Sequence, residues 1–291
     1  MSIFQSERLD DRKRGKEIIE KLKKSNNKTL IIHYSCESFF NLEGRTPRIT
    51  SICIKNRGNN LTKTFSIHLQ AQFHKKDLCC ITHEENDFLE KQMLKEFFEF
   101  VKKHSTYNWV HWNMRNSSYG FEAISNRFRI LGGNAKEIED QFKFDLPENL
   151  GLLYTYDFEK HKPKGQLLNL AFRNKISDRD ALIGKDEAKS FEDRDYLKLH
   201  MSTCRKVEII DRILTLEEKN KLKVNANSIK IYGLTPNGIF EIVRNNWVLF
   251  LIWSLIVAIL GAAFEPIIQY FSGHTKITNA DEFIGRLNRT G

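Results

Sequence analysis

The sequence predicts an α/β protein in which a mixed sheet is flanked by helices and is followed by a C-terminal transmembrane helix. Three strand-like segments come in close succession after residue 28, and strands and helices then alternate along the chain. Near the C-terminus, Trp247–Phe264 forms a stretch of eighteen residues without a charge. As a helix this stretch approaches the thickness of a bilayer's hydrocarbon core, roughly 30 Å.

Composition sets wide limits on the class of protein. With 291 residues, of which 41% are hydrophobic, the chain can bury a sizeable core, which excludes a disulfide-stapled miniprotein and a fully disordered chain. Lys and Arg (46) outnumber Asp and Glu (37), and the formal charge of +9 favours a polyanionic partner or an anionic membrane surface. The five cysteines include no Cys-x-x-Cys pair, which favours reduced thiols.

The N-terminal part of the chain is charged. Residues 1–27 are expected to form a helix that lies on the domain, because Ile18, Ile19 and Leu22 form a narrow apolar stripe at helical spacing. The α/β domain itself is expected over residues 28–218.

The first elements of this domain have strand character. Thr29–Tyr34, Arg48–Lys55 and Leu61–Leu69 are rich in β-branched and aromatic residues and are separated by turn-forming residues. The tight connections predict an antiparallel meander.

Helices dominate the rest of the domain. Asp87–Lys103 and Tyr119–Leu131 carry apolar residues at helical spacing, and Tyr107–Trp112 between them is typical of a short apolar strand. Two further helices are expected at Gln166–Arg173 and Tyr196–Leu216. Between them, Asp178–Asp193 is expected to form a charged loop or a broken helix.

The C-terminal part is expected to hold a linker (219–235), a juxtamembrane and transmembrane helix (236–271) and a polar tail (272–291). Thr235 is the expected N-cap and Pro236 the first helical residue. A buried core helix is the alternative interpretation of the apolar run. Basic residues flank the run evenly, so the positive-inside rule does not orient the helix. The N-terminus has no apolar stretch of signal-peptide length that would direct export. We therefore expect a single-pass membrane protein with its soluble domain in the cytoplasm.

Polar residues stand where chemistry is expected. The first strand ends in Ser35-x-Glu37, a later strand is followed by Asn113, and the last helix carries His200. Together with the order of elements, this pattern resembles the ribonuclease H-like fold of the DnaQ-like (DEDDh) 3′–5′ exonucleases over roughly residues 28–216. In that family four carboxylates hold two divalent metal ions and a histidine activates the attacking water.

Three of the family's carboxylates are replaced in this chain. Ser35 stands in place of the first Asp, Asn116 or Ser117 in place of the next, and Arg205 in place of the Asp that follows the family's histidine by five residues. The resemblance therefore implies a degenerate metal site.

Glu37 and His200 remain as remnants of the catalytic set. One Glu with Arg205 nearby cannot balance the charge of two adjacent divalent cations in a low-dielectric pocket. We therefore expect an inactive exonuclease-like domain with no metal and no cofactor. Mg²⁺ or Mn²⁺ is needed only if the alternative holds, an active nuclease with rearranged ligands.

Basic and aromatic residues are interleaved around the second strand-helix pair. Arg115, Arg127 and Arg129 are expected to hold phosphates there, and core packing is the alternative interpretation of the aromatic residues. The full predicted binding set is Ser35, Asn113, Asn116, Arg115, Arg127, Arg129 and Arg205.

The leading hypothesis is a membrane-anchored domain that binds nucleic acid, a nucleotide or a protein partner, in a defence or stress-response setting. Besides the nuclease, a second alternative is a membrane effector whose transmembrane helix self-associates into a homo-oligomer and perturbs the bilayer. A further alternative is a nucleophilic pair of Cys36 and His200, which requires that the first strand and the last helix meet.

Overall fold

The computed structural model describes residues 3–38, 42 and 46–266. The chain divides into two compact units. The first, Ser6–Ile231, contains the sheet and its helices, and the second contains Met1–Gln5 and the chain from Tyr232 onward. The sheet-bearing unit confirms the predicted α/β class.

A mixed five-stranded sheet with strand order β3-β2-β1-β4-β5 forms the centre of the first unit. β1 pairs antiparallel with β2, and β2 pairs antiparallel with β3, which confirms the predicted meander. β1 also pairs in parallel with β4, and β4 in parallel with β5. The strands are β1 (Thr29–Cys36), β2 (Ile49–Asn56), β3 (Thr62–Ser66), β4 (Asn108–His111) and β5 (Lys143–Asp145).

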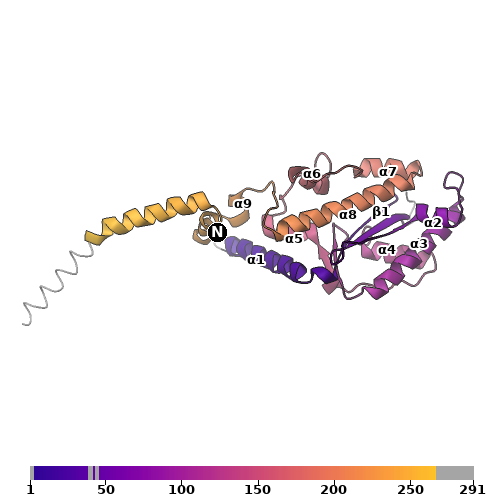
Figure 1. The fold of residues 1–291 in the computed structure, drawn as a ribbon, viewed down its shortest axis with the longest axis horizontal. Helices are drawn as coiled ribbons and strands as arrows, with labels where there is room; N and C mark the ends of the chain where they lie inside the picture. Colours follow the sequence, from indigo (N-terminus) through magenta and orange to yellow (C-terminus); the bar gives the residue numbers. More distant parts are fainter. Residues whose placement is uncertain (1–2, 39–41, 43–45, 267–291) are drawn as a thin grey trace, which may run out of the picture. The chain divides into compact units, whose positions relative to one another are not determined.

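Helices cover both faces of this sheet (Figure 1). Successive side chains of β1 alternate between the faces, so that Leu30 and Ile32 enter one core cluster and Ile31 enters the other. The first cluster is completed by α2 (Ile67–Phe73), α3 (His83–Lys103) and α4 (Phe121–Ile130). The second is completed by α1 (Ile3–Lys24), α5 (Leu146–Tyr154), α6 (Gln166–Arg173) and α8 (Tyr196–Glu218).

Capping residues explain two differences from the predicted boundaries. The strand expected to run to Leu69 ends at Ser66, whose side chain accepts the Leu69 N–H and so begins α2. The helix expected from Asp87 begins at His83, because Thr82 and Glu85 form a capping box.

Three elements were not predicted as such. β5 has three residues, which is too short to show a strand periodicity, and α5 follows it directly with Pro147 in its first turn. The charged segment predicted as a loop or broken helix contains α7 (Gly184–Glu192).

The N-terminal helix α1 is held on the first unit by polar and apolar contacts. Leu22 is buried in the second core cluster. Arg8 donates to the carbonyl of Leu152 (2.5 Å) and Arg12 to that of Leu153 (2.6 Å), in the last turn of α5. At the C-terminus of α5 these two guanidinium groups bind carbonyl groups that have no partner within the helix. Their positive charge also interacts favourably with the negative end of the helix dipole.

The first part of the predicted linker, 219–235, packs on the same unit. The N–H of Asn225 donates to the carbonyl of Phe158 (2.7 Å), and the N–H of Lys223 donates to the Asn174 side chain (2.8 Å). A short helix, α9 (Ser228–Tyr232), follows.

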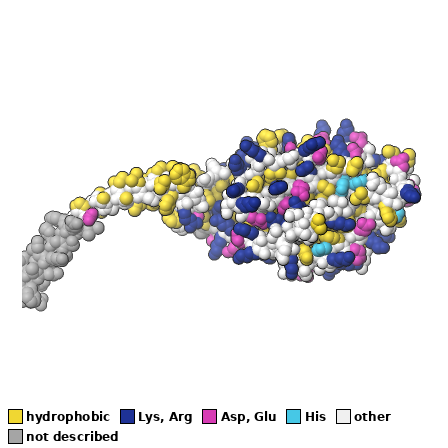
Figure 2. All heavy atoms as spheres, viewed as in Figure 1, with side chains coloured by type: hydrophobic (Ala, Val, Ile, Leu, Met, Phe, Trp, Pro, Cys, Tyr) yellow, Lys and Arg dark blue, Asp and Glu magenta, His cyan; other side chains and the backbone are white. Residues whose placement is uncertain are grey.

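The second unit contains two helices among its described residues. In α10 (Pro236–Arg244) the Thr235 hydroxyl accepts the N–H of Gly238, so the predicted N-cap is confirmed. The helix Trp247–Pro266 is long and apolar enough to cross a membrane and has no buried share (Figure 2). The rest of the predicted membrane helix (267–271) and the polar tail (272–291) lie outside the described residues.

Candidate functional site

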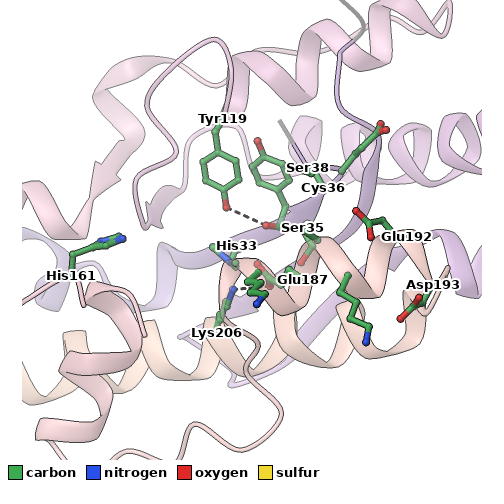
Figure 3. Close-up of a pocket in the computed structure, with 16 residues that line it drawn as sticks. His33, Ser35, Cys36, Ser38, Tyr119, His161, Glu187, Glu192, Asp193 and Lys206 are labelled. Carbon is green, nitrogen blue, oxygen red and sulfur yellow. Dashed lines mark hydrogen bonds and ion pairs between the residues drawn. The ribbon is translucent and has the colours of Figure 1, made fainter. Parts of the chain in front are cut away.

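A cavity of about 1100 Å³ opens at the carboxyl end of β1 (Figure 3). The strand order reverses at β1, because β2 and β3 follow on one side of it and β4 and β5 on the other. In α/β sheets ligands bind outside the carboxyl ends of strands at such switch points. The cavity, called the β1 cavity below, is lined by residues 33–38, Tyr119, His161, residues 184, 185, 187–189, 192 and 193 in and after α7, and Lys206 of α8.

Ser35 joins β1 to β2 and to α8 through buried hydroxyl groups. The Oγ1 of Thr203 lies 2.5 Å from the Oγ of Ser35 and 2.8 Å from the Oγ of Ser51. Thr203 donates to the carbonyl of Leu199, so it accepts from the serines. The position predicted to carry a degenerate metal ligand is therefore engaged in a structural hydrogen-bond network.

A buried ammonium group stands in the cavity wall. The Nζ of Lys206 donates to the Oε1 of Glu187 (2.6 Å), and the hydroxyl of Ser202 donates to the same oxygen (2.9 Å). Figure 3 shows Lys206, Glu187 and His33 close together beside the end of β1. A fixed cation at this place disfavours a second cation, such as a metal ion.

His33 provides an unused hydrogen-bonding atom in the same wall. The residue is 7% exposed, and within the described part of the chain its Nδ1 has no hydrogen-bond partner. Burial holds the pKa of His33 well below its ordinary value, and the charge of Lys206 adds to this effect. His33 therefore adds a neutral imidazole, and no charge, to this wall of the cavity.

An aromatic pair closes another side of the cavity. The rings of Tyr34 and Tyr119 stack with centroids 4.5 Å apart, and the Tyr119 hydroxyl donates to the Tyr34 carbonyl (3.1 Å). Asn116 shapes the loop that delivers Tyr119, because its Oδ1 accepts the N–H groups of Ser118 and Tyr119. Asn116 itself does not line the cavity.

The residues present do not fit a two-metal centre. In the described ranges, no group of three or more His, Cys, Asp and Glu side chains is placed to hold a metal ion. Of the predicted remnants, Glu37 lines the cavity, where its carboxylate accepts the N–H of Arg48 (3.2 Å). Charged neighbours in the lining are Lys185, Glu187, Lys189, Glu192, Asp193 and Lys206.

The predicted phosphate-binding arginines do not share one surface. Arg127 is buried and pairs with Glu90 (2.6 Å) and Asp87 (2.9 Å). Glu90 is fully buried, and its charge requires a buried counter-charge such as that of Arg127. The prediction that Arg127 holds phosphates is therefore wrong. Arg129 is exposed and paired with Glu137.

Asn113 and Arg115 gather at the ends of β4 and β5. The N–H of Asn113 donates to Asp145 (2.9 Å), and Arg115 pairs with Asp145 (2.7 Å) and Glu148 (3.4 Å). Burial raises the pKa of Asp145 to about 6. Neither Asn113 nor Arg115 lines the β1 cavity.

His200 and Arg205 line a different hollow, of about 340 Å³. The predicted convergence of Glu37 with His200 is therefore not found. The alternative nucleophilic pair of Cys36 and His200 is not formed either. Cys36 lines the β1 cavity, and burial raises its pKa. The Nε2 of His200 instead lies 3.7 Å from the sulfur of Cys204. Cys204 was not singled out from the sequence. Its spacing of four residues from His200 places the two side chains next to each other on a helix.

Comparison with known proteins adds no relative. Neither models of protein families nor curated proteins match the chain.

Proposed function

We propose that this chain is a membrane-anchored binding protein whose α/β unit holds a nucleotide, or the end of a nucleic-acid strand, in the β1 cavity without cleaving it. The observation that carries this proposal is the cavity lining: the ammonium group of Lys206 and the ring of Tyr119 surround the end of β1 beside Ser35. Both ligands share the chemistry of a flat base and an anionic phosphate.

The order of strands supports an exonuclease-like ancestry. A meander followed by two parallel strands, with β1 at the centre, agrees with the element order on which the DnaQ-like resemblance depends. In such a fold the cavity at the end of β1 is the place for a nucleotide. Here Ser35 stands where the family has a metal-binding Asp, and Lys206 already pairs with Glu187, one of the carboxylates of the lining.

The lining offers contacts for both parts of a nucleotide. Tyr119 presents an aromatic ring, and stacking of a base on such a ring contributes about 1–3 kcal/mol. Lys185 and Lys189 on α7 are exposed cations for a phosphate. The volume of about 1100 Å³ suits a ligand of nucleotide size.

The helix Trp247–Pro266 supports the anchoring part of the proposal. The five cysteines, all free thiols, support a reducing compartment and so a cytoplasmic α/β unit. The predicted role in defence stays a prediction, as does the membrane-effector alternative.

One observation favours the nuclease alternative. Glu37, Glu187, Glu192 and Asp193 line the same cavity and are its acidic candidates for rearranged ligands. The test of binding therefore includes a test of cleavage.

The test measures binding of a fluorescent single-stranded oligonucleotide and of ATP to the full-length protein in detergent. Replacing Lys185 and Lys189 with Gln should weaken oligonucleotide binding about tenfold. It should also reduce the steepness of the plot of log affinity against log salt by about 1.4, because each lost phosphate contact reduces this slope by about 0.7 for a single strand. The matched control replaces Lys95 and Lys103, exposed lysines of α3 that lie outside the β1 cavity, with Gln.

Equal weakening by both double variants would show non-specific attraction and contradict the proposal. Cleavage of the oligonucleotide with Mg²⁺ or Mn²⁺, lost on Glu37→Gln, would establish the nuclease instead. A wild-type protein that binds neither probe would point to a protein partner.

A further inference from the structure

A second hollow, separate from the β1 cavity, contains a thiol next to an imidazole. It has a volume of about 340 Å³ and opens between the start of β3 and the outer side of α8. Cys204 is half-buried in its wall. The remaining lining residues are Thr62, Asp180, His200, Met201, Arg205 and Glu208.

Two groups contact the sulfur of Cys204 directly. The Nε2 of His200, one helical turn earlier on α8, lies 3.7 Å from the sulfur. The thiol of Cys53, on the inner side of β2, makes a side-chain hydrogen bond to it. Cys53 is fully buried, so of the two sulfurs only that of Cys204 is reached from the hollow.

The contacts divide the two thiols into a donor and an acceptor. The hydrogen bond from Cys53, followed by that from His200, lowers the pKa of Cys204 to about 5, against burial and the charge of Glu208. The same hydrogen bond and burial raise the pKa of Cys53, against the charge of Lys55. Of the two thiols, Cys204 is therefore the one that forms a thiolate more readily.

A thiolate that is reached from solvent and has a second thiol beside it is the arrangement of a redox-sensitive cysteine pair. From this geometry we propose that Cys204 is an oxidation site for hydroperoxides and that Cys53 resolves the oxidised residue as a Cys53–Cys204 disulfide. No step involves the β1 cavity, so the proposal is independent of the ligand proposed for that cavity.

The chemistry balances without a further reactant. The Cys204 thiol releases its proton, its sulfur attacks the terminal oxygen of the hydroperoxide, and the O–O bond breaks. The leaving alkoxide takes up the proton that the thiol released and becomes an alcohol. Cys204 is then a sulfenic acid. Cys53 loses its proton and attacks this sulfur, the S–O bond breaks, and water leaves as the S–S bond forms. Two thiols are oxidised and one hydroperoxide is reduced by two electrons.

The disulfide would link β2 to α8. That helix also carries Thr203, which binds Ser35, and Lys206, which lines the β1 cavity. Oxidation at Cys204 therefore acts on the helix that shapes the candidate ligand site.

The experiment treats the full-length protein in detergent with one to two equivalents of hydrogen peroxide, blocks remaining thiols, and locates disulfides by mass spectrometry. We expect a Cys53–Cys204 disulfide in most molecules, with Cys36 and the exposed Cys79 still alkylated. In Cys53→Ser, a reagent specific for sulfenic acids should label Cys204. In His200→Gln, oxidation should be about tenfold slower. His74→Gln, at a histidine that lines neither hollow, should leave the rate unchanged.

The wild-type protein alone decides the main claim, whatever the stability of the variants. If Cys53 and Cys204 both remain free thiols while Cys79 or Cys80 is oxidised, the proposal is wrong. A persistent sulfenic acid at Cys204 with no disulfide would overturn the role of Cys53.

Discussion

Asp145 is an acidic side chain whose properties are set by its position in the fold. It ends β5 and precedes α5, and its side chain is only 4% exposed. The N–H of Asn113 and the guanidinium of Arg115 favour its charged form, but burial outweighs both and raises the pKa to about 6. A raised pKa means that the folded protein holds this proton more tightly than the unfolded chain does.

Replacing Asp145 with Asn should therefore change how stability depends on pH. For wild type the contribution of Asp145 is greatest below pH 4 and is lost as the pH rises through about 6. Relative to Asp145→Asn, wild type should lose roughly 2 kcal/mol of unfolding free energy between pH 4 and pH 7. Urea unfolding of both full-length proteins in detergent, at one-unit pH steps, measures this difference.

The matched control is Asp140→Asn in the same loop region. Lys143 lowers the pKa of Asp140, an exposed residue, so any pH dependence should be smaller and opposite in sign. A constant difference between wild type and Asp145→Asn across the pH range would contradict the assignment.

At the scale of elements, one buried carboxylate joins α3, β2 and α4. Oε1 of Glu90 accepts the N–H of Ile49 (2.7 Å) and Nε of Arg127 (3.0 Å). Oε2 accepts from Arg48 (3.1 Å) and again from Arg127 (2.6 Å). The two guanidinium groups are buried with it and depend on its charge.

Glu90→Gln should cost about 3 kcal/mol of unfolding free energy, because the neutral amide leaves two buried cations with only the partly exposed carboxylate of Asp87 as counter-charge. Glu99→Gln, which removes the exposed pair with Lys102 on the same helix, should cost less than about 0.5 kcal/mol. The midpoints of urea unfolding compare the two variants. Similar small losses in both would show that the cations are stabilised by other groups.

Sequence patterns predicted the elements whose periodicity is local. The meander β1–β3 and the helices α3 and α8 have enough residues to show their spacing, whereas β5 has three residues and is defined by its pairing with β4. A strand formed by a distant partner leaves no signal in its own sequence.

The candidate site was predicted in part, for a similar reason. Ser35 and Glu37 lie at the end of β1 as expected, because a strand's end is visible in the sequence. Helical spacing places Thr203 and Lys206 on one side of α8 and His200 with Cys204 on the next. It does not tell which side meets β1, and so it could not show that Glu37 and His200 line different hollows.

At the scale of the whole chain, charge and apolar surface are divided between the two units. In Figure 2 charged side chains cover the α/β unit, whereas apolar ones follow the helix Trp247–Pro266. The alternative of a buried core helix is not supported, because no share of this helix is buried and side chains such as Leu255 are 62% exposed. Apolar surface costs about 25 cal/mol per Å² in water, so this helix requires lipid or a protein partner around it.

Ending the chain at Asn246 should therefore release the protein from membranes, since no other helix in the described part is long and apolar enough to span a bilayer. The control ends the chain at Pro266, which keeps the whole helix and should stay in the membrane pellet. The pellet is washed with carbonate, which removes proteins that are bound to the membrane surface by charge but leaves inserted helices in place. The wash is needed because the chain has an excess of Lys and Arg, which could bind the α/β unit to an anionic membrane surface. If the shorter chain stayed in the carbonate-washed pellet, the anchor would lie outside Trp247–Pro266. If the longer chain were also released, the helix would be a surface for a protein partner.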